Sequence, residues 1–585
     1  MNLKKILTLN VMAATLAACG GGDVNLNPSV KPASSSPLLP ASSAPVLSSS
    51  APALSSASSS SIQSSVLSSS SSSQVATACA SYTQAGQTFE GTLTGVNCIY
   101  PVGFASSNKQ ITVNLMIPEL PNAGVHVFQG SLFIGEDVTA SAAAGGKAIP
   151  QDGQGAVLTI APGAKIAFER GEDYVRIARG SRMIADGTKD KPIIFSAVKD
   201  LVEKTATVAD RGLWGGLQIN GNGLTNKCTD GERTATANNP HACHILSEGL
   251  PGTYGGNNNA ESSGTLRYVV VKHAGYKVVE GNELNAVNFN AVGSGTLVDH
   301  VQSYAAQDDA FEWFGGAVNA KHLVAVATSD DSFDFTEGYV GHIQYALSVA
   351  PAGVGGNHCV EADNAGTDRP DNSTPLTKVR ISNLTCVTND VAKNTGTVIS
   401  PDGDSLGILV REGFFIELYN SILTSNAAGM SSKSLFIFND TEGPQTIKAA
   451  MDGWSVAKSN LIAGTGGTAQ TRVNAANAGF TTAAWLANAT NTGNQLLTAA
   501  NQLPANILKD LATNDKAYLT LQTLTDATTA PITISLFDVS QLADLAQPNL
   551  GTPPVAGASN FFVAPSHLGA ASETNDWVAG WTVGL

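Results

Sequence analysis

An internal repeat is the feature that most limits how this chain can fold. The segment Asp308–Trp313 (DDAFEW) recurs 22 residues later as Asp330–Phe335 (DDSFDF). Weaker copies lie 24 residues before the first segment and 27 residues after the second, at Asn285–Phe289 and Asn357–Glu361. A period of this length with about three short strands predicts an all-β chain wound as a right-handed parallel β-helix. Leucine-rich repeats share the period, but their Leu-x-x-Leu-x-Leu pattern is missing.

Alternation along each repeated strand predicts which side chains share a face, because successive strand residues point to opposite sides of a sheet. The apolar members should stack inward as a ladder: Val287, Phe311, Phe333 and Val360. Their neighbours should form a single outward file on consecutive coils: Asn288, Glu312, Asp334 and Glu361.

A second column precedes this file and consists of Asn285, Asp309, Asp331 and His358. Asp and Asn at the corners of a coil often accept hydrogen bonds from the turn backbone and stack as ladders, so one interpretation is structural. The other interpretation places Asp309 and Asp331 in a site with the outward file. The sequence leaves both open.

The outward file is the sharpest chemical feature. Coils of a parallel sheet lie about 4.8 Å apart, so stacked carboxylates repel one another and need a cation, a basic neighbour or a raised pKa. Oxygen ligands of this kind suit Ca²⁺. Polysaccharide lyases built on β-helices use Ca²⁺ beside acids, whereas hydrolases use paired carboxylates as acid and base. The candidate ligand- or metal-binding residues are Glu312, Asp334, Glu361, Asn288, Asp309 and Asp331; none is assigned a catalytic role.

The N-terminus predicts export and lipidation. Lys4 and Lys5 precede a short apolar run that ends in Leu-Ala-Ala-Cys, with Cys19 followed by glycine. This resembles the lipobox of bacterial lipoproteins, which implies a signal peptide over 1–18 and a lipid-modified Cys19 that anchors the chain to a membrane. An ordinary signal peptide with a chance cysteine is the alternative. No Asp follows the cysteine, so we expect the outer membrane, at its surface or its periplasmic face.

Domain boundaries follow from composition. Residues 19–78 are dominated by serine, alanine and proline and should form a flexible linker. The repeat and its flanking strands predict a β-helix over 79–465. From 466 to 585 the repeat fades, and we expect a smaller mixed cap or module that covers the end of the solenoid.

The cysteines predict disulfides rather than metal or redox sites. Six remain after Cys19, an even number in an oxidising compartment, and none forms a Cys-x-x-Cys motif. They fall into three local couples, expected to pair as Cys79–Cys98, Cys228–Cys243 and Cys359–Cys386, although six cysteines allow 15 connectivities.

Several segments resemble a widespread family of bacterial cell-surface proteins, many of them lipoproteins. They include Leu158–Gly163, Arg179–Phe195, Trp214–Leu217, Asp308–Gly316 and the closing Asp576–Trp581. The likeness is strong over about 125–347 and looser elsewhere. It implies a right-handed β-helix at the cell surface, and since it carries no settled activity it assigns no catalytic residue.

These features together favour a surface-anchored protein that binds an extracellular polymer, most readily a polysaccharide, with Ca²⁺ as a candidate ion. The net charge of −15 argues against nucleic acid as a partner, because acidic proteins repel phosphate backbones. Two alternatives stay open: a polysaccharide lyase or glycoside hydrolase, and a non-catalytic structural or adhesive surface protein.

Overall fold

A computed structural model describes most of the chain from Cys79 onward. The described residues are 79–106, 108–234, 241–279, 281–351, 356–364, 370, 372–388, 406–425, 435–440, 445–463, 470–472, 477–497, 532–542, 560–572 and 574–585. The expected signal peptide, Cys19 and the linker lie outside them. Within these ranges, no helix has the length and hydrophobicity needed to cross a bilayer.

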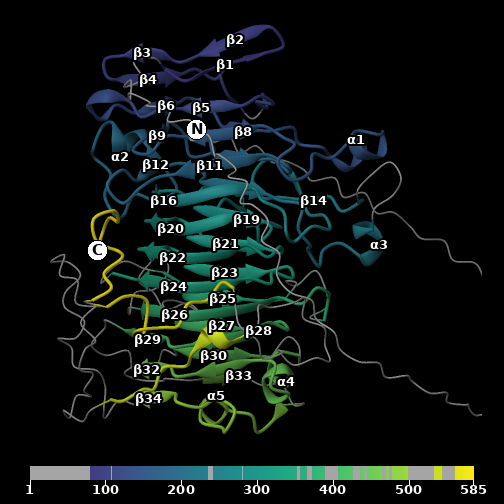
Figure 1. Cartoon of the computed structure of the whole chain (residues 1–585), viewed down its shortest axis with the longest axis vertical. Coiled ribbons are helices and arrows are strands. Elements are labelled where there is room, and N and C mark those ends of the chain that lie inside the picture. The colour runs from purple at the N-terminus through teal and green to yellow at the C-terminus, as the bar shows by residue number, and fades with distance from the viewer. Residues whose placement is uncertain are drawn as a thin grey trace, which may run out of the picture. The chain divides into compact units, whose positions relative to one another are not determined.

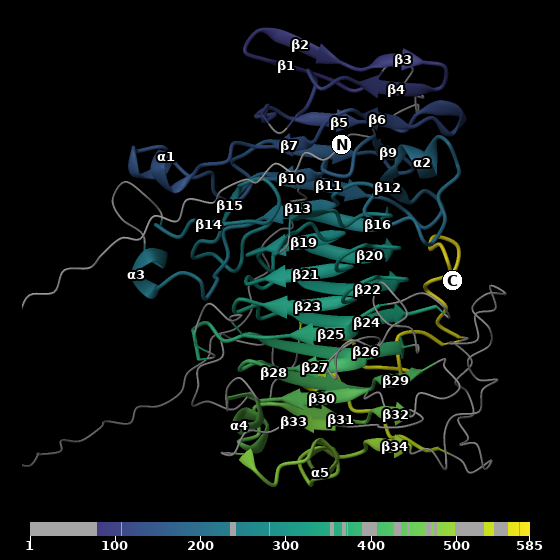
Figure 2. The ribbon, with the colours of Figure 1, turned by 180° about the vertical axis from the view of Figure 1, so that it is seen from behind.

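The described chain winds into a right-handed parallel β-helix, which confirms the predicted fold class (Figure 1 and Figure 2). One side of the coil is a ten-stranded parallel sheet. Its strands, in chain order, are β7 (Leu132–Ile134), β10 (Val175–Ile177), β13 (Leu217–Asn220), β19 (Val287–Asn290), β21 (Phe311–Phe314), β23 (Phe333–Thr336), β25 (His358–Ala362), β27 (Leu406–Val410), β30 (Phe436–Asn439) and β33 (Gln470–Arg472).

An 18-stranded sheet supplies the other sides of each coil. Its first members are β3 (Thr92–Thr94), β4 (Asn97–Tyr100), β5 (Leu115–Ile117), β6 (His126–Phe128), β8 (Val157–Ile160), β9 (Lys165–Phe168), β11 (Arg182–Asp186) and β12 (Ile193–Ala197). The later members are β16 (Gly264–Lys272), β20 (Leu297–Tyr304), β22 (Asn319–Val326), β24 (His342–Val349), β26 (Lys378–Thr388), β28 (Phe415–Tyr419), β29 (Ile422–Ser425), β31 (Val456–Lys458), β32 (Leu461–Ala463) and β34 (Gln495–Leu497).

The long strands of this sheet each turn a corner at one residue in the left-handed region. Tyr268, His300, His322 and Tyr345 occupy equivalent places in β16, β20, β22 and β24, with φ between 48° and 62°. The ladder pairing skips the corner residue: Asp299 pairs with Lys321 and Val301 with Leu323, while His300 and His322 between them do not pair. One long strand therefore forms two faces of the coil.

The inward ladder predicted from the repeat forms as expected. Val287 pairs with Phe311, and Phe333 pairs with Val360, while the rings of Phe311 and Phe333 stack with centroids 5.7 Å apart. All four side chains are buried in the same core cluster. Burial of large apolar side chains of this kind stabilises a fold by about 1.5–3 kcal/mol each.

Short antiparallel pieces and helices lie outside the coils. Before the first coil, β1 (Ser81–Gln84) pairs with β2 (Gln87–Glu90), and β3 pairs with β4. The other elements are β14 (Ile245–Leu246), β15 (Thr253–Tyr254), β17 (Lys277–Val279), β18 (Asn282–Glu283), α1 (Ala140–Ala144), α2 (Val198–Leu201), α3 (Asp230–Arg233), α4 (Gln445–Met451), α5 (Thr482–Leu486), η1 (Pro121–Ala123) and η5 (Val539–Gln541). The antiparallel hairpins stand where a solenoid would otherwise present a free edge.

The chain beyond residue 465 has two structural parts. Parallel pairing continues past the expected boundary, because β33 pairs with β30 and β34 pairs with β32. Helix α5 packs Trp485 into the core beside these last coils. The final described segments, 532–542 and 560–585, instead lie against the outside of the 18-stranded sheet.

Two of the three expected disulfides are present. Cys79–Cys98 and Cys228–Cys243 are bonded, whereas Cys359 and Cys386 are buried free thiols, so the third expected pairing is wrong. Both free thiols lie in the core cluster. Burial, together with the neighbouring Cys359 thiol, raises the pKa of Cys386 well above its usual value, and a protonated thiol is a poor nucleophile for disulfide formation.

Candidate functional site

The outward file forms in the predicted register. Asn288 pairs with Glu312, Glu312 with Asp334, and Asp334 with Glu361, on the consecutive strands β19, β21, β23 and β25. The four side chains point away from the core but are largely shielded from solvent: Asn288 is 2% exposed, Glu312 and Glu361 are each 9% exposed, and Asp334 is partly exposed. Something outside the coils therefore covers the file.

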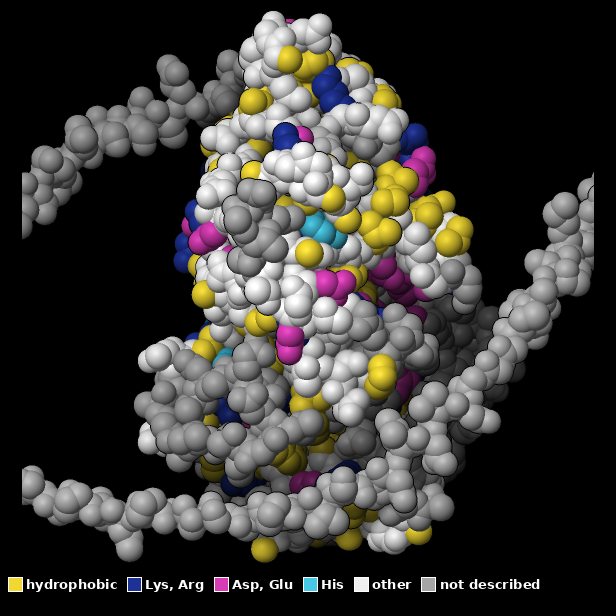
Figure 3. All heavy atoms as spheres, turned by 90° about the vertical axis from the view of Figure 1, so that its right-hand side faces the viewer, with side chains coloured by type: hydrophobic (Ala, Val, Ile, Leu, Met, Phe, Trp, Pro, Cys, Tyr) yellow, Lys and Arg dark blue, Asp and Glu magenta, His cyan; other side chains and the backbone are white. Residues whose placement is uncertain are grey.

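Part of that cover is an insert, residues 221–263, between β13 and β16. It carries α3, β14 and β15 and is closed by the Cys228–Cys243 disulfide. The buried guanidinium of Arg179 anchors it by donating hydrogen bonds to the carbonyl oxygens of Cys243 and Gly255, both at 3.0 Å. Figure 3 looks onto the side toward which this insert projects, and acidic side chains are visible there.

Glu248 of the insert reaches the file directly. Its Oε2 accepts hydrogen bonds from the Nδ2 atoms of Asn285 (3.2 Å) and Asn288 (3.5 Å). The same Nδ2 of Asn285 also donates to Glu312 Oε2. One amide therefore holds two carboxyls, one from the insert and one from a coil.

A cavity of about 340 Å³ lies between the insert and the ten-stranded sheet. The insert lines it with Lys227, Ile245, Leu246, Ser247, Glu248 and Tyr254, and the coils line it with Asn290, Phe314 and Glu337. The rings of Tyr254 and Phe314 lie 6.4 Å apart, and Glu337 accepts a 2.6 Å hydrogen bond from the Tyr254 hydroxyl. The repeat could not reveal Glu248 or Tyr254, because the insert lies outside the periodic pattern.

The second column is a ladder that satisfies the corner backbone. Oδ1 of Asn285 accepts from Asp309 N (3.1 Å), Oδ1 of Asp309 from Asp331 N (2.9 Å), and Oδ1 of Asp331 from His358 N (2.6 Å). This is the arrangement that the structural interpretation requires. Asp309 and Asp331 nevertheless also offer oxygens to the site, since one oxygen from each lies within 4.8 Å of one from Asp334.

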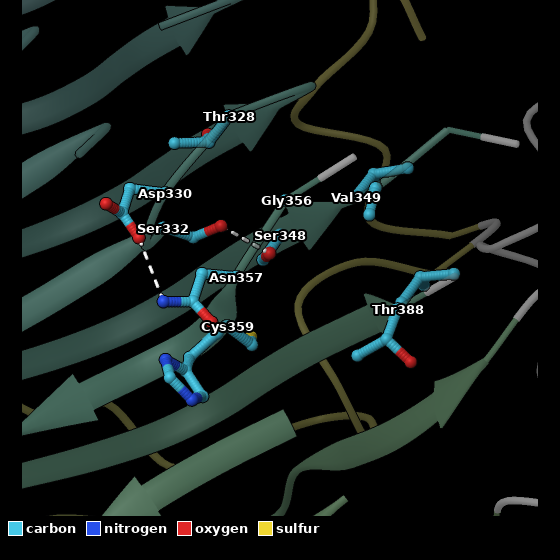
Figure 4. A pocket seen from close by; sticks show the side chains of 12 residues that line it. Thr328, Asp330, Ser332, Ser348, Val349, Gly356, Asn357, Cys359 and Thr388 are labelled. Atoms are coloured by element: carbon cyan, nitrogen blue, oxygen red, sulfur yellow. Dashed lines mark hydrogen bonds between the residues drawn. The ribbon is translucent and has the colours of Figure 1, made fainter. Parts of the chain in front are cut away.

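A second, much smaller cavity lies next to the same corner (Figure 4). Its volume is about 20 Å³, room for a single water molecule. Two hydrogen bonds join residues that line it: Asn357 Nδ2 donates to Asp330 Oδ1 at 2.9 Å, and the hydroxyls of Ser332 and Ser348 lie 2.8 Å apart. The larger cavity is therefore the better place for a ligand.

The lower end of the file is neutralised by basic groups. Arg411 approaches Glu361 at 2.8 Å, and His358 Nδ1 lies 3.4 Å from the same carboxylate. Burial favours the neutral acid, but the charge of Arg411, together with the hydrogen bonds that Glu361 shares with Asp331 and His358, outweighs burial and lowers the pKa of Glu361. Glu361 thus lies in the file as predicted, but Arg411 from the next coil already compensates its charge.

The upper part of the file has no such ion pair in the described chain: the charge of Arg411 acts on the pKa of Asp334 but does not outweigh burial and the charge of Glu361. Among the residues that the structure describes, no ion pair joins Glu312, Asp334 or Glu248 to a basic side chain. Burial, followed by the charges of Glu248 and other nearby carboxyls, raises the pKa of Glu312 well above its usual value. Burial and the charge of Glu361 do the same to the pKa of Asp334. These carboxyls must hold protons or share a cation.

Two buried oxygens on either side of Glu312 lack hydrogen-bond partners. They are Oδ1 of Asn288 on the preceding coil and Oδ1 of Asp334 on the following coil. Unsatisfied buried oxygens cost about 1–3 kcal/mol each, so a native fold normally gives them a partner. A donor set of carboxylate and amide oxygens fits Ca²⁺.

Comparison with known proteins agrees with this architecture. A family model described as "Pectate-lyase like beta helix domain" matches residues 145–502, more than half of the chain. The chain belongs to this family. No curated protein and no solved structure matches it.

The matched region of this pectate-lyase-like β-helix runs from before β8 to beyond β34. It therefore contains the outward file, the corner ladder, the insert and the larger cavity. The N-terminal hairpins and the segment 532–585 lie outside it.

Proposed function

We propose that this chain binds an extracellular polysaccharide in the cavity between the 221–263 insert and the ten-stranded sheet. The observation that carries the proposal is the position of that 340 Å³ cavity. Glu248 lines the cavity and also accepts hydrogen bonds from Asn285 and Asn288 beside the uncompensated carboxyls of the file. Its size lies within the range of small-ligand sites. Phe314 and Tyr254 offer apolar ring faces, while Asn290, Ser247 and Lys227 offer polar groups to hydroxyls. A family described as pectate-lyase like supports a polysaccharide over other polymers.

A divalent cation, for which Ca²⁺ is the best match, is part of the proposal. Glu312 and Asp334 on adjacent coils would hold it, and Asp309, one oxygen of which lies within 4.8 Å of one from Asp334, would add a third oxygen, while Asn288 and Glu248 lie beside Glu312. When bound, Ca²⁺ would neutralise these carboxyls and attract acidic sugar units. The chain's own groups do the rest: Asn285 fixes the positions of Glu248 and Glu312, and the insert keeps bulk water from the file.

Anchoring at a membrane completes the proposed function. A lipid on Cys19 and the serine-rich linker would hold the β-helix at an outer-membrane surface, where glycans are available. Metabolic labelling with a fatty-acid analogue tests this step, and a Cys19→Ser chain that is labelled as strongly as the wild type would contradict it.

Glycan binding with and without calcium tests the central proposal. The full-length chain is titrated with acidic glycans such as polygalacturonate and alginate, and with neutral glycans such as xylan. We expect acidic glycans to bind in Ca²⁺ and to be released by EDTA. The Glu312→Gln/Asp334→Asn variant should lose at least about tenfold in affinity, the equivalent of 1.4 kcal/mol.

A matched control is Glu203→Gln, which changes an exposed carboxyl away from the file and should bind as the wild type does. Failure to bind any glycan in either condition would contradict the polysaccharide proposal and favour a purely structural or adhesive protein. Glycan binding with no effect of EDTA or of Ca²⁺ on the melting temperature would remove the cation alone.

Acid–base cleavage of a glycan is the second candidate, and one observation favours it. Glu248 and Glu312 are two buried carboxyls that share the Asn285 amide, and burial raises the pKa of each well above its usual value. Such a pair can hold a protonated acid beside an ionised partner. A lyase that uses Arg411 as its base is disfavoured, because Glu361 and its neighbours raise the pKa of Arg411 against the effect of burial. Release of reducing ends would support hydrolysis, and an inert chain that still binds glycan would exclude it.

A further inference from the structure

The C-terminal segment, residues 560–585, lies along the outer face of the 18-stranded sheet (yellow in Figure 1 and Figure 2). Trp577 and Trp581 are 8% and 3% exposed and pack with Val270, Val324 and Leu347 of β16, β22 and β24. The segment forms no strand in the part that the structure describes, so it does not belong to the ladder of the sheet. It is held instead by side chains of the coils.

Amide side chains of the sheet bind the backbone of this segment. Gln302 donates to Val583 O at 2.7 Å and accepts from Val583 N at 2.8 Å. Gln344 makes the same two contacts with Val563, at 2.8 and 3.1 Å. Both amides are fully buried, and both satisfy one N–H and one C=O of the same residue, as a neighbouring strand would.

The amide pattern extends to the segment 532–542. Asn420 pairs with the backbone of Phe537 in the same bidentate way, at 2.9 and 2.7 Å. Asn383 adds a single bond to His567 O at 2.7 Å. Because the contacts are with backbone groups, this face recognises an extended chain more than particular side chains.

A stack of four aromatic rings at the corner of the coil, here called the aromatic socket, adds contacts with particular side chains of the segment. Tyr268, His300, His322 and Tyr345 stack on consecutive coils, with centroid distances of 4.3, 4.2 and 5.2 Å. Asp299 Oδ1 lies 2.9 Å from His300 Nδ1 and accepts from His322 at 2.7 Å, which fixes the two imidazoles.

The tryptophans of the segment fill this socket edge-on. Trp581 contacts Tyr268 at 5.6 Å and an interplanar angle of 89°. Trp577 contacts His322 at 4.8 Å and 63°. Edge-to-face aromatic pairs add favourable, geometry-dependent energy beyond burial, so two tryptophans four residues apart give a defined signature.

We propose that this face is a peptide-binding surface whose ligand is the C-terminal segment, and that a second copy of the chain can supply that segment in trans. The segment lies beyond the family match, which ends at residue 502, and contributes no described strand to the sheet, so it is not one of the coils. It can leave without breaking any strand pairing of the sheet. Tethering gives the chain's own segment a high effective concentration, and exchange between copies follows when that segment is displaced.

Binding of a synthetic peptide tests the surface. The probe is a fluorescent peptide of residues 574–585, and the receptor is the full-length Trp577→Ala/Trp581→Ala chain, whose own segment no longer fills the socket. We expect saturable binding to this variant and at least tenfold weaker binding to the wild type, in which the tethered segment competes. A peptide with both tryptophans replaced by alanine is the control. A folded variant that binds neither peptide, or equal binding by the variant and the wild type, would overturn the proposal.

Exchange between copies is tested by mixing two complementary full-length variants. One is Trp577→Ala/Trp581→Ala, with an intact socket; the other is Gln302→Ala/His322→Ala, with an intact segment. We expect a one-to-one complex by light scattering after mixing and monomers from each variant alone. Peptide binding without this complex would overturn the trans exchange.

Hydrogen exchange on the wild-type chain keeps the proposal testable if a variant fails to fold. We expect the amides of 574–585 to exchange together and at least tenfold faster than those of β20 and β22, because the segment opens independently. Exchange of the segment only together with these strands would show that it is part of the core, and would overturn the proposal.

Discussion

Two buried glutamates on this β-helix have opposite electrostatic surroundings. Glu417 in β28 lies 2.8 Å from Lys378 Nζ, accepts a 2.6 Å bond from Arg380 Nε and accepts another from the Tyr419 hydroxyl at 3.0 Å. Burial opposes its ionisation, but the two cations outweigh that effect and lower its pKa to about 2. For Glu312, by contrast, burial and the charges of nearby carboxyls all act in the same direction and raise its pKa.

The contrast arises from the register of the coils. Glu417 pairs with Arg380 of the preceding coil, so the scaffold itself provides the countercharge. Glu312 pairs with Asn288 on one side and Asp334 on the other, so stacking brings no countercharge to it. The same fold can therefore neutralise a buried acid or leave it without a countercharge, and the acids without a countercharge are those at which we propose a cation to bind.

Removing a countercharge of Glu417 should have the largest effect on the free energy of unfolding. Arg380→Met leaves Glu417 buried with a weakened charge balance, and we expect a loss of about 3–5 kcal/mol in the free energy of unfolding. Chemical denaturation measures it. The triple variant Lys378→Met/Arg380→Met/Glu417→Leu should recover much of that loss, because it removes all three buried charges. A single variant within 1 kcal/mol of the wild type would show that the ion network contributes little.

A third buried acid, Glu261, should make the stability of the fold depend on pH. It accepts a 2.6 Å bond from Gly293 N, yet burial raises its pKa to about 7. Between about pH 4.5 and 7 the folded state keeps this proton while the unfolded state releases it, so stability falls as pH rises. The shift corresponds to a loss of order 3 kcal/mol. We expect Glu261→Gln to flatten this part of the pH profile of unfolding, and an unchanged slope would contradict the assignment.

Removing a carboxyl that has no countercharge should stabilise the fold, whereas removing Arg380 should destabilise it. Without divalent cations at pH 8, Glu312→Gln should stabilise the chain, because burial and the neighbouring carboxyls, which raise the pKa of Glu312, make its ionised form costly in the folded state. In millimolar Ca²⁺ the wild type should gain stability and the variant should not. Thermal melting in EDTA and in Ca²⁺ measures both effects. Destabilisation of the variant in EDTA would mean that Glu312 is already compensated.

The smallest effect is expected where the file is already neutralised. Arg411 is about one-third exposed, so Arg411→Gln should change stability by only about 0.5–1 kcal/mol. The same change frees Glu361, and we expect a few-fold increase in Ca²⁺ affinity by calorimetry. A decrease in affinity would indicate that Arg411 positions the file rather than competing with a cation.

The sequence predicts those parts of the molecule that obey the repeat. The register of Glu312, Asp334 and Glu361 was predictable because a shift of one residue would move the apolar partners Phe311 and Phe333 out of the core. The paired disulfides were also predictable, because both join nearby cysteines. The same reasoning gave a wrong pairing for Cys359 and Cys386, which lie on strands of two different sheets. Buried thiols of this kind behave as small apolar core residues.

Features that join distant parts of the chain were not predictable. Glu248 meets Glu312 only because the insert lies across the coils, and no spacing in the sequence encodes that contact. Arg411 follows a strand that lacks the acidic pattern, so its approach to Glu361 depends on the fold alone. The pairing of Gln302 with Val583 joins residues 281 positions apart.

The 221–263 insert joins two consecutive strands of the solenoid, β13 and β16, and is closed by its own disulfide. It provides six of the nine residues around the larger cavity, while the coils beneath keep their own pairing. Replacing this one loop would therefore exchange most of the cavity wall and remove Glu248 from beside the file, while the pairing of the stacked coils stays the same.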